Sequence, residues 1–270
     1  HRGNTDGGDD IRMKYRYLDL RRANVAAILE LRHKMTIEVR KYLDSQGFIE
    51  VETPILQSIA GGAAARPFIT HHNALDMPLY MRIASELYLK RLIVGGFEGV
   101  YEIGKNFRNE GMDRTHNPEF TCMEIYVAYK DYNWMMEFTE KMIEKICLDV
   151  NGTTEVQVGD NMINFKAPFK RVTMLDSIKE FTGYDLTGMN EEQIREVCKK
   201  LNMEIDDTMG KGKLIDEIFG EILRKATHIQ PTFITDYPIR NGLPLTKKHR
   251  MQFPDLTERF ELMVNGKELV

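Results

Sequence analysis

The sequence predicts an α+β domain in which helices back an antiparallel sheet. Two observations favour this class. Segments of strand character come in neighbouring pairs joined by turns, which is the arrangement of hairpins in an antiparallel sheet. Long segments with apolar residues at helical spacing stand before and after these pairs, so helices are available to cover one face of the sheet.

The N-terminal third contains the first helix and the first strands. Residues 1–22 are polar, glycine-rich and then basic, and are predicted to be a linker ending in a short helical or extended arm. Apolar spacing over 23–46 predicts a long amphipathic helix closed by Gly47. A short strand, FIEVETP, then ends at Pro54. A hairpin over 68–84 follows, and then a helix that begins at Ser85, SELYLKRLIVGG.

The remaining elements follow the same logic. Two strands, VYEIG and TCMEIYVAY, flank the polar stretch FRNEGMDRTHNPEF at 107–120. A second long helix, DYNWMMEFTEKMIEKICLDV, ends at the Asn151–Gly152 turn and precedes a hairpin at 153–165. Residues 172–228 are predicted to be a helical insertion, after which PTFITDYP and RFELMVNGKELV return to strand character. We expect 23–270 to form one domain that contains this insertion.

Composition narrows the class of protein. Hydrophobic residues make up 42% and charged residues 29%, which is typical of a globular domain. No apolar run is long enough to span a membrane, and a net charge of −4 gives no global basic field for nucleic acid. The three cysteines show no metal-ligand spacing, so we expect buried, reduced thiols in a cytoplasmic protein. The first residue is not Met, and we expect the chain to be a piece of a longer one.

The stretch at 107–120 is unusually polar for a strand connection. Side chains two apart on a strand share a face, so Arg108 lies with Glu110, while the next strand presents a row of Phe120, Cys122, Glu124 and Tyr126. The alternate positions Met123, Ile125 and Val127 are apolar and suit the core. A merely solvated face is the alternative. A phenylalanine among charges, the stiff His116–Asn117–Pro118 loop and the nearby acid Glu86 favour a binding site.

These residue types indicate what such a site could bind. An arginine offers a planar fork for phosphate or carboxylate. A phenylalanine beside it can stack on a flat base, and clustered carboxylates can hold an ammonium group.

A second pair of acids lies near the C-terminal end. Asn265–Gly266 is a strong two-residue hairpin signal, which would pair Val264 with Lys267 and Met263 with Glu268. Glu261 would then share a face with Glu268, and the two carboxylates would be diagonal neighbours. Such a pair can share a Mg²⁺ ion together with substrate phosphates. The alternative is two solvent-exposed acids beside a turn.

Several of these segments resemble the class II aminoacyl-tRNA synthetases. GFIEVETPIL at 47–56 resembles the first motif of that family, a dimer-interface helix and strand. VYEIGKNFRNEGMDRTHNPEFTCMEIYVAY at 100–129 resembles the second motif. Residues 61–104 are similar to the bacterial lysyl-tRNA synthetase subfamily over their whole length. The fold that the resemblance implies is an antiparallel sheet flanked by helices.

The resemblance also implies roles for single residues toward ATP. Arg108 is expected to bind the α-phosphate and the amino-acid carboxylate, and Glu110 to lie near the adenine and its ribose. His116 is expected near the outer phosphates and Phe120 against the adenine ring. Of these, Arg108 and Glu110 are the expected catalytic pair.

Toward L-lysine, the resemblance implies a pocket made by Glu86, Glu124 and Tyr126, with a backbone contact from Gly62. Glu261 and Glu268 resemble the Mg²⁺ ligands of the family, which favours the metal site over two solvated acids. The implied reaction joins lysine to AMP and then passes lysine to tRNA(Lys). The first motif also implies a homodimer, the alternative being an ordinary packed helix in a monomer.

The chain departs from the family pattern in three places. The anticodon-reading OB-fold domain and the glycine-rich third motif are not found in these 270 residues, and the loop at 238–256 differs from the usual pattern. We therefore expect this segment to bind ATP weakly and to charge tRNA poorly or not at all. Two alternatives stay open: a paralogue that attaches lysine to a translation factor, and a catalytically inactive, dimerising synthetase-like module.

Overall fold

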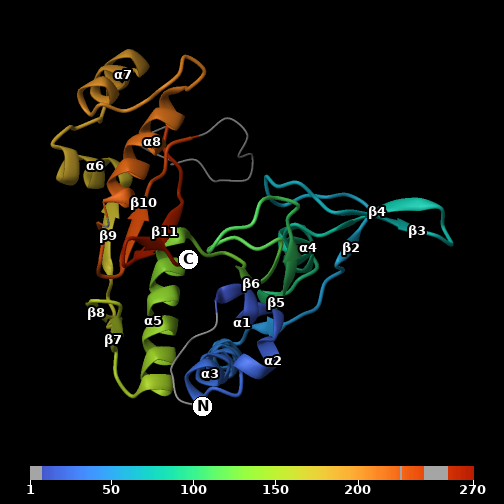
Figure 1. The fold of residues 1–270 in the computed structure, drawn as a ribbon. Helices are drawn as coiled ribbons and strands as arrows, with labels where there is room; N and C mark the ends of the chain where they lie inside the picture. Colours follow the sequence, from blue (N-terminus) through green and yellow to red (C-terminus); the bar gives the residue numbers. More distant parts are fainter. Residues whose placement is uncertain (1–7, 226, 240–254) are drawn as a thin grey trace. The chain divides into compact units, whose positions relative to one another are not determined.

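The computed structural model describes residues 8–225, 227–239 and 255–270, which divide into two compact units (Figure 1). Residues 39–130 form one unit, and the segments 1–38 and 131–270 together form the other. Most of the atypical loop at 238–256 lies outside the described residues. The α+β class is confirmed, since helices accompany sheets whose strand pairs are mostly antiparallel.

The unit at 39–130 is built around one long hairpin. β5 (Gly99–Phe107) and β6 (Glu119–Val127) pair antiparallel over nine residues each, and the short β1 (Ile49–Glu50) adds to β5 in parallel. The predicted strand pair is therefore confirmed, but the first strand is longer than predicted, the second begins and ends two residues earlier than predicted, and the connection is 108–118. The strands extend because the backbone hydrogen-bond ladder continues to the Phe107–Glu119 pair.

A second small sheet and a helix complete this unit. β2 (Leu56–Gln57), β4 (Met77–Met81) and β3 (Ile69–His72) form a sheet in the order β2-β4-β3, in which β3 and β4 are the predicted hairpin. α4 (Glu86–Val94) begins after Ser85 and packs against β5 and β6. This packing places the first turn of α4 beside the long hairpin.

The other unit begins with helices. α1 (Asp9–Lys14) and α2 (Arg16–Asp19) lie in the predicted linker, where the buried Asp19 carboxylate accepts hydrogen bonds from Arg12, Arg16 and Arg22. α3 (Ala23–Ser45) is the predicted long helix and crosses the boundary between the units. The division into a linker at 1–22 and a domain at 23–270 stays a prediction.

The second long helix is α5 (Tyr132–Asn151). The Asp131 side chain caps its start by accepting from the Trp134 N–H at 2.9 Å, and Gly152 ends it at a φ of 72°. The hairpin of β7 (Glu155–Val158) and β8 (Asn161–Asn164) follows, as the sequence predicts.

A four-stranded sheet with the order β12-β11-β10-β9 carries the insertion. Its strands are β9 (Lys170–Thr173), β10 (Thr232–Thr235), β11 (Phe260–Val264) and β12 (Lys267–Glu268), with β9 and β10 parallel. Three helices lie between β9 and β10 in the chain, α6 (Met174–Thr182), α7 (Glu191–Lys200) and α8 (Lys211–Arg224). They bury a shared apolar core that includes Ile178, Ile194 and Leu214, so this region is helical as predicted, and its being an insertion stays a prediction.

Two predictions from composition can also be compared with the structure. Among the described residues, no helix is both long and apolar enough to cross a membrane. The three cysteines are unpaired thiols; Cys147 and Cys198 are buried, whereas Cys122 is only partly buried.

Candidate active site

Arg108 lies directly after β5 and is held at both its backbone and its side chain. Its N–H donates to the Pro118 carbonyl at 2.8 Å, which extends the ladder by one residue. Its Nε donates to the Ile83 carbonyl at 3.3 Å, and the guanidinium carbon lies 5.2 Å from the centre of the Phe120 ring. The structure thus brings together the cation and the ring that the sequence assigns to phosphate and base.

Glu86 occupies the first position of α4, where the positive end of the helix dipole favours a carboxylate. It forms an ion pair with Lys90 one turn later. Gly62 faces it at close range: a methyl group on Gly62 would lie 3.3 Å from the Glu86 Cβ and 3.3 Å from the Ala84 Cβ. Gly62 also adopts a φ of 91°, which a residue with a side chain rarely takes. Glycine therefore serves both the backbone conformation and the close approach.

Glu124 and Tyr126 lie on β6, and the Tyr126 hydroxyl donates to Glu124 Oε2 at 2.9 Å. Burial raises the pKa of Tyr126 well above its ordinary range, and the nearby carboxylates of Glu124 and Glu86 raise it further. The effect of both acids on the pKa of one hydroxyl indicates that Glu86, Glu124 and Tyr126 lie close together, and their role as a pocket for an ammonium group stays a prediction.

A buried ion pair, Arg82 with Glu102, lies under the same strand face. Arg82 Nη1 donates to Glu102 Oε2 at 2.8 Å, and these residues are only 1% and 4% exposed. The register places Glu102 opposite Glu124. Sequence reasoning missed this pair. The available signal was Glu102 itself, an acid on the face of Arg108 within an otherwise largely apolar strand.

The connection at 108–118 carries the two remaining residues assigned to ATP. His116 and Asp113 pair across a tight turn, with Nδ1 2.9 Å from a carboxylate oxygen. The Thr115 N–H, followed by the His116 side chain, lowers the pKa of Asp113 to about 2. Glu110 is exposed in a bend after β5. Strand alternation therefore does not decide its direction, because the strand ends at Phe107.

Glu261 and Glu268 form a second cluster on β11 and β12. The register pairs Val264 with Lys267 and Met263 with Glu268, which confirms the predicted hairpin. Glu261 accepts a hydrogen bond from the Tyr237 hydroxyl at 2.8 Å and pairs with Arg259. Partial removal from water and then the Glu261 carboxylate raise the pKa of Glu268, although the residue as a whole remains exposed.

The donor chemistry of this cluster fits a Mg²⁺ ion. Two carboxylates close enough to repel one another are typical of a site that a divalent cation completes. In the part of the chain that the structure describes, no group of three or more His, Cys, Asp or Glu side chains could hold a metal. Protein carboxylates alone thus do not form a full cage there, and phosphate oxygens would have to supply the other ligands.

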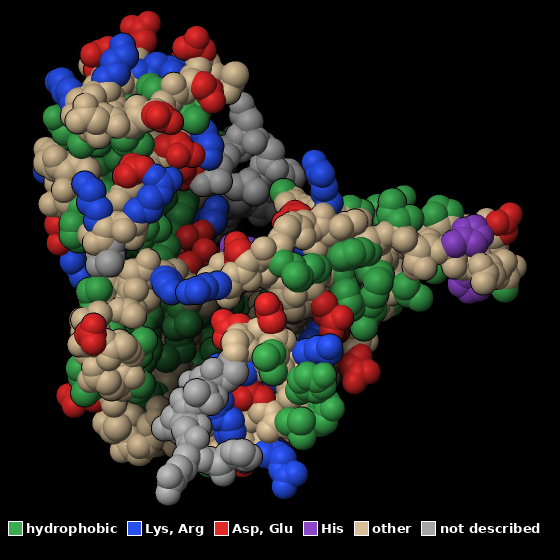
Figure 2. Space-filling model, viewed as in Figure 1, with side chains coloured by type: hydrophobic (Ala, Val, Ile, Leu, Met, Phe, Trp, Pro, Cys, Tyr) green, Lys and Arg blue, Asp and Glu red, His purple; other side chains and the backbone are tan. Residues whose placement is uncertain are grey.

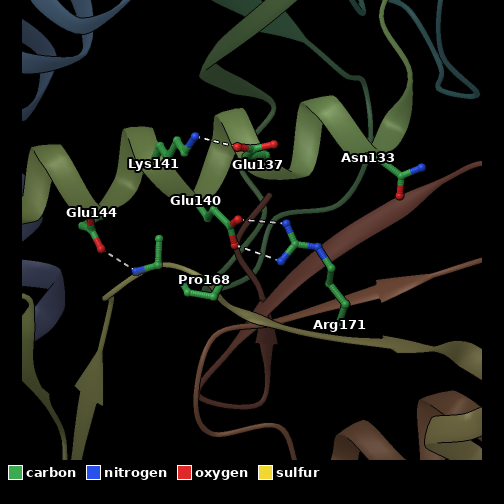
Figure 3. A pocket seen from close by; sticks show the side chains of 8 residues that line it. Asn133, Glu137, Glu140, Lys141, Glu144, Pro168 and Arg171 are labelled. Atoms are coloured by element: carbon green, nitrogen blue, oxygen red, sulfur yellow. Dashed lines mark hydrogen bonds and ion pairs between the residues drawn. The ribbon is translucent and has the colours of Figure 1, made fainter.

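A cavity of about 640 Å³ lies between α5 and the segment 167–171 (Figure 3). The charged side chains that line it are paired with neighbouring groups. Glu140 forms a bidentate ion pair with Arg171, Glu137 forms an ion pair with Lys141, and Glu144 accepts a hydrogen bond from the Ala167 N–H. We therefore assign this cavity a structural role, in which α5 fixes the approach to β9.

The fold and the first cluster define the class of the protein. A sequence model of the family described as "tRNA synthetases class II (D, K and N)" matches residues 8–270. The chain belongs to this family, as the motifs at 47–56 and 100–129 predict.

Comparison with individual proteins gives a more specific similarity within the family. The chain is 66% identical over 267 residues to a "Lysine--tRNA ligase" of Porphyromonas gingivalis, which covers 98% of this chain and 46% of that protein. A protein of the same name from Christiangramia forsetii is 63% identical over 99% of the chain and 47% of its own length. The protein of that name from Azobacteroides pseudotrichonymphae is 59% identical over 98% and 53%. The chain thus spans about half the length of these relatives.

Proposed function

We propose that this chain carries the amino-acid activation site of a lysine–tRNA ligase, which uses ATP to convert L-lysine to lysyl-adenylate and passes lysine to tRNA(Lys). The observation that carries the proposal is the acidic pocket of Glu86, Glu124 and Tyr126 in the same unit as Arg108 and Phe120. The names of the relatives support the choice of lysine.

The pocket explains why lysine would be chosen over a neutral amino acid. The substrate ammonium would replace the Lys90 ammonium as the partner of Glu86 and would add a donor to Glu124. An amino acid without this charge would leave two partly buried carboxylates short of a partner, which costs several kcal/mol. Gly62 leaves the space beside Glu86 that the substrate needs.

Activation is a displacement at phosphorus. The lysine carboxylate oxygen forms a bond to the α-phosphorus of ATP, and the bond from that phosphorus to the bridging oxygen breaks as pyrophosphate leaves. Arg108 would neutralise charge on the α-phosphate while Phe120 supports the adenine, so the chain contributes mainly position and charge. The terminal ribose hydroxyl of tRNA would then attack the lysyl carbonyl carbon, and AMP would leave.

Three further assignments belong to the proposal. Glu110 would lie near the adenine and ribose, and His116 would contact the outer phosphates. Glu261 and Glu268 would hold Mg²⁺, which supplies positive charge for substrate phosphates when it is bound. The Asp113–His116 pair supports the second assignment, because it fixes the histidine in the loop that follows Arg108.

We also propose that the protein acts as a homodimer in the cytoplasm. Several large apolar side chains of α3 are exposed, among them Ile28 at 63% and Leu29 at 48%. Figure 2 shows further hydrophobic side chains gathered over β3 and β4, where Ile69 is 66% exposed. Such surfaces are typical of association sites. Light scattering at micromolar concentration tests the dimer, and a monomeric mass would contradict it.

The test of function is lysine-dependent exchange between ATP and pyrophosphate in the presence of Mg²⁺. We expect exchange that requires lysine and that falls at least about tenfold at low lysine in Glu124→Gln, because a charge-assisted partner of the ammonium is lost. Glu119→Gln is the matched control, since this exposed acid lies on the same strand and pairs with Lys105. Folded full-length gene product without lysine-dependent exchange would contradict the proposal, whereas weak or no exchange from the 270-residue segment alone is the impairment expected from its sequence.

A second assay identifies the acceptor of lysine. With exchange established, transfer of radiolabelled lysine to tRNA(Lys) supports the ligase, whereas transfer only to a protein acceptor would indicate a lysine-modifying paralogue. The two assays apply to this chain and to the full-length gene product, so that the activity of the segment itself is measured.

A further inference from the structure

Arg82 is the most deeply buried charged side chain in the unit at 39–130, and both its Nε and its Nη1 donate hydrogen bonds. Nε donates to the Lys105 carbonyl at 2.9 Å. Nη1 donates to Glu102 Oε2 at 2.8 Å and to the Thr53 hydroxyl at 3.1 Å. A buried arginine with this many partners joins three segments of the chain at one point.

The guanidinium lies on the same face of the strands as the activation site. Gly104 is opposite Cys122 in the β5–β6 register, between the Glu102–Glu124 pair and the Asn106–Phe120 pair. A methyl group on Gly104 would lie 2.4 Å from Arg82 Nη2, so the arginine fills the space that a side chain would occupy. Arg82 therefore places a fixed positive charge in the row that also carries Glu124 and Phe120.

The positive charge of Arg82 determines which of two neighbouring carboxylates, Glu102 or Glu124, can bind the substrate ammonium. Glu102 and Glu124 are opposite one another on one face, where two free carboxylates would repel. Glu102 is neutralised by Arg82 and also accepts from the Thr53 N–H at 3.1 Å and from the Thr53 hydroxyl. Its acceptor oxygens are thereby occupied. Glu124 keeps only the Tyr126 hydroxyl as a hydrogen-bond donor among the contacts resolved on this face.

Arg82 also contacts the backbone segments that orient the Arg108 side chain. The Arg82 carbonyl accepts from the Phe107 N–H at 2.9 Å, and its side chain holds the Lys105 carbonyl. The carbonyl of the next residue, Ile83, accepts from Arg108 Nε. The backbone on both sides of this contact is thus fixed by one residue, because Arg82 precedes Ile83 and holds the end of β5 through its carbonyl at Phe107 and its side chain at Lys105.

We infer that Arg82 is a positioning residue for lysine activation: it neutralises Glu102 so that Glu124 is the open carboxylate, and it holds the backbone that aims Arg108. This inference rests on the proposed function. Arg82 itself contacts neither substrate in this arrangement, since it is 1% exposed.

The principal test is the double variant Arg82→Met with Glu102→Gln, which removes both buried charges and keeps an acceptor for Thr53. We expect it to fold, and we expect the kcat of pyrophosphate exchange to fall about tenfold or more while the KM values for lysine and ATP change less than about threefold. Arg82→Lys keeps the charge without the planar fork, and we expect the same fall in kcat from it. It serves as the second variant if the first does not fold.

The matched control is Arg171→Met with Glu140→Gln. In this pair the acid, Glu140, is buried while the Arg171 side chain is 35% exposed, and both line the structural cavity beside α5 (Figure 3). We expect this variant to exchange pyrophosphate at the unmodified rate. A folded Arg82 variant that keeps the original kcat would overturn the inference.

A second readout does not depend on catalysis. Burial and Glu124 raise the pKa of Cys122, whereas Arg108 and then Arg82 lower it. In a background with Cys147→Ala and Cys198→Ala, the pH profile of Cys122 alkylation by iodoacetamide should move to higher pH when Arg82 and Glu102 are replaced. An unchanged pH profile would contradict the claim that Arg82 places a positive charge on the strand face that carries Cys122. If the full-length gene product shows no lysine-dependent exchange, the proposed function fails, and the alkylation profile then tests by itself whether Arg82 lowers the pKa of Cys122.

Discussion

The Tyr126 hydroxyl donates to Glu124 Oε2 over 2.9 Å, and both side chains project from one face of β6. Because burial and the two neighbouring acids raise the pKa of Tyr126 above its ordinary value, the hydroxyl keeps its proton at neutral pH. Tyr126 is therefore a permanent donor that orients Glu124. A substrate ammonium would meet a carboxylate whose direction is already fixed.

The Tyr126→Phe substitution tests this orientation. We expect the KM for lysine to rise about tenfold, because a hydrogen bond to a charged group contributes about 1.5 kcal/mol or more. The KM for ATP should stay unchanged. Tyr129→Phe is the control, since Tyr129 follows the same strand and its side chain is fully exposed. Steady-state exchange at varied lysine measures both variants, and equal KM values would contradict the role of the hydroxyl.

Gly62 provides a second test of the lysine pocket. We expect Gly62→Ala to raise the KM for lysine, because the new methyl group would press on Glu86 and narrow the pocket. It should also cost about 1 kcal/mol of stability through its left-handed backbone. Gly96→Ala separates the two effects, since Gly96 has a φ of 106° with no atom within 4 Å of the added methyl group. A rise in KM in both variants would show that backbone strain, and not contact with Glu86, is responsible.

The sequence was sufficient to predict the local elements of the site. Alternation along β6 placed Phe120, Glu124 and Tyr126 together, and the Asn265–Gly266 turn predicted the register of β11 and β12. Partners distant in the chain were not predictable in this way. Thr53, Arg82 and Glu102 meet only because three segments converge, and no periodicity in any one of them signals the meeting.

The sequence analysis also missed the Tyr237–Glu261 contact in the second cluster, because its two residues are distant in the chain. Tyr237 is 24 residues from Glu261, and the hydrogen bond between them depends on the folded sheet. Glu110 shows the opposite case: alternation was extended past the point where the strand ends, so its direction could not follow from its position.

The acid pair on β11 and β12 predicts a pH-dependent stability. A carboxyl group whose folded pKa is raised destabilises the fold once it ionises, so its unfavourable effect is absent at low pH and grows as pH rises through the ordinary value of 4.5 and then the raised value. We therefore expect Glu268→Gln to raise Tm at pH 8 without Mg²⁺ and to have less effect at pH 5. Added Mg²⁺ should raise the Tm of the unmodified protein more than that of the variant, if the pair holds the ion. Thermal unfolding at the two pH values measures this, and a variant with lower Tm at pH 8 would contradict the repulsion.

The Glu140–Arg171 pair makes a prediction about stability alone. Glu140 is 3% exposed and accepts hydrogen bonds from both terminal nitrogens of Arg171, at 3.0 and 2.9 Å (Figure 3). It also accepts a hydrogen bond from the Phe169 N–H at 2.8 Å. Glu140→Ala leaves a buried N–H and a guanidinium without their acceptor. We expect a loss of about 3 kcal/mol in the free energy of unfolding, at the low end for a buried pair because the Arg171 side chain is still 35% exposed.

Two further variants show whether that loss comes from the unpaired groups. Glu137→Gln removes an exposed acid on the same helix, paired with Lys141, and should unfold at the same urea concentration as the unmodified protein. Arg171→Met with Glu140→Gln should recover most of the stability that Glu140→Ala loses, because no charge is left buried alone and an acceptor remains for the Phe169 N–H. Urea titrations of the three variants measure these differences. A loss in Glu137→Gln as large as in Glu140→Ala would mean that the acidic face of α5, rather than this one buried pair, stabilises the approach to β9.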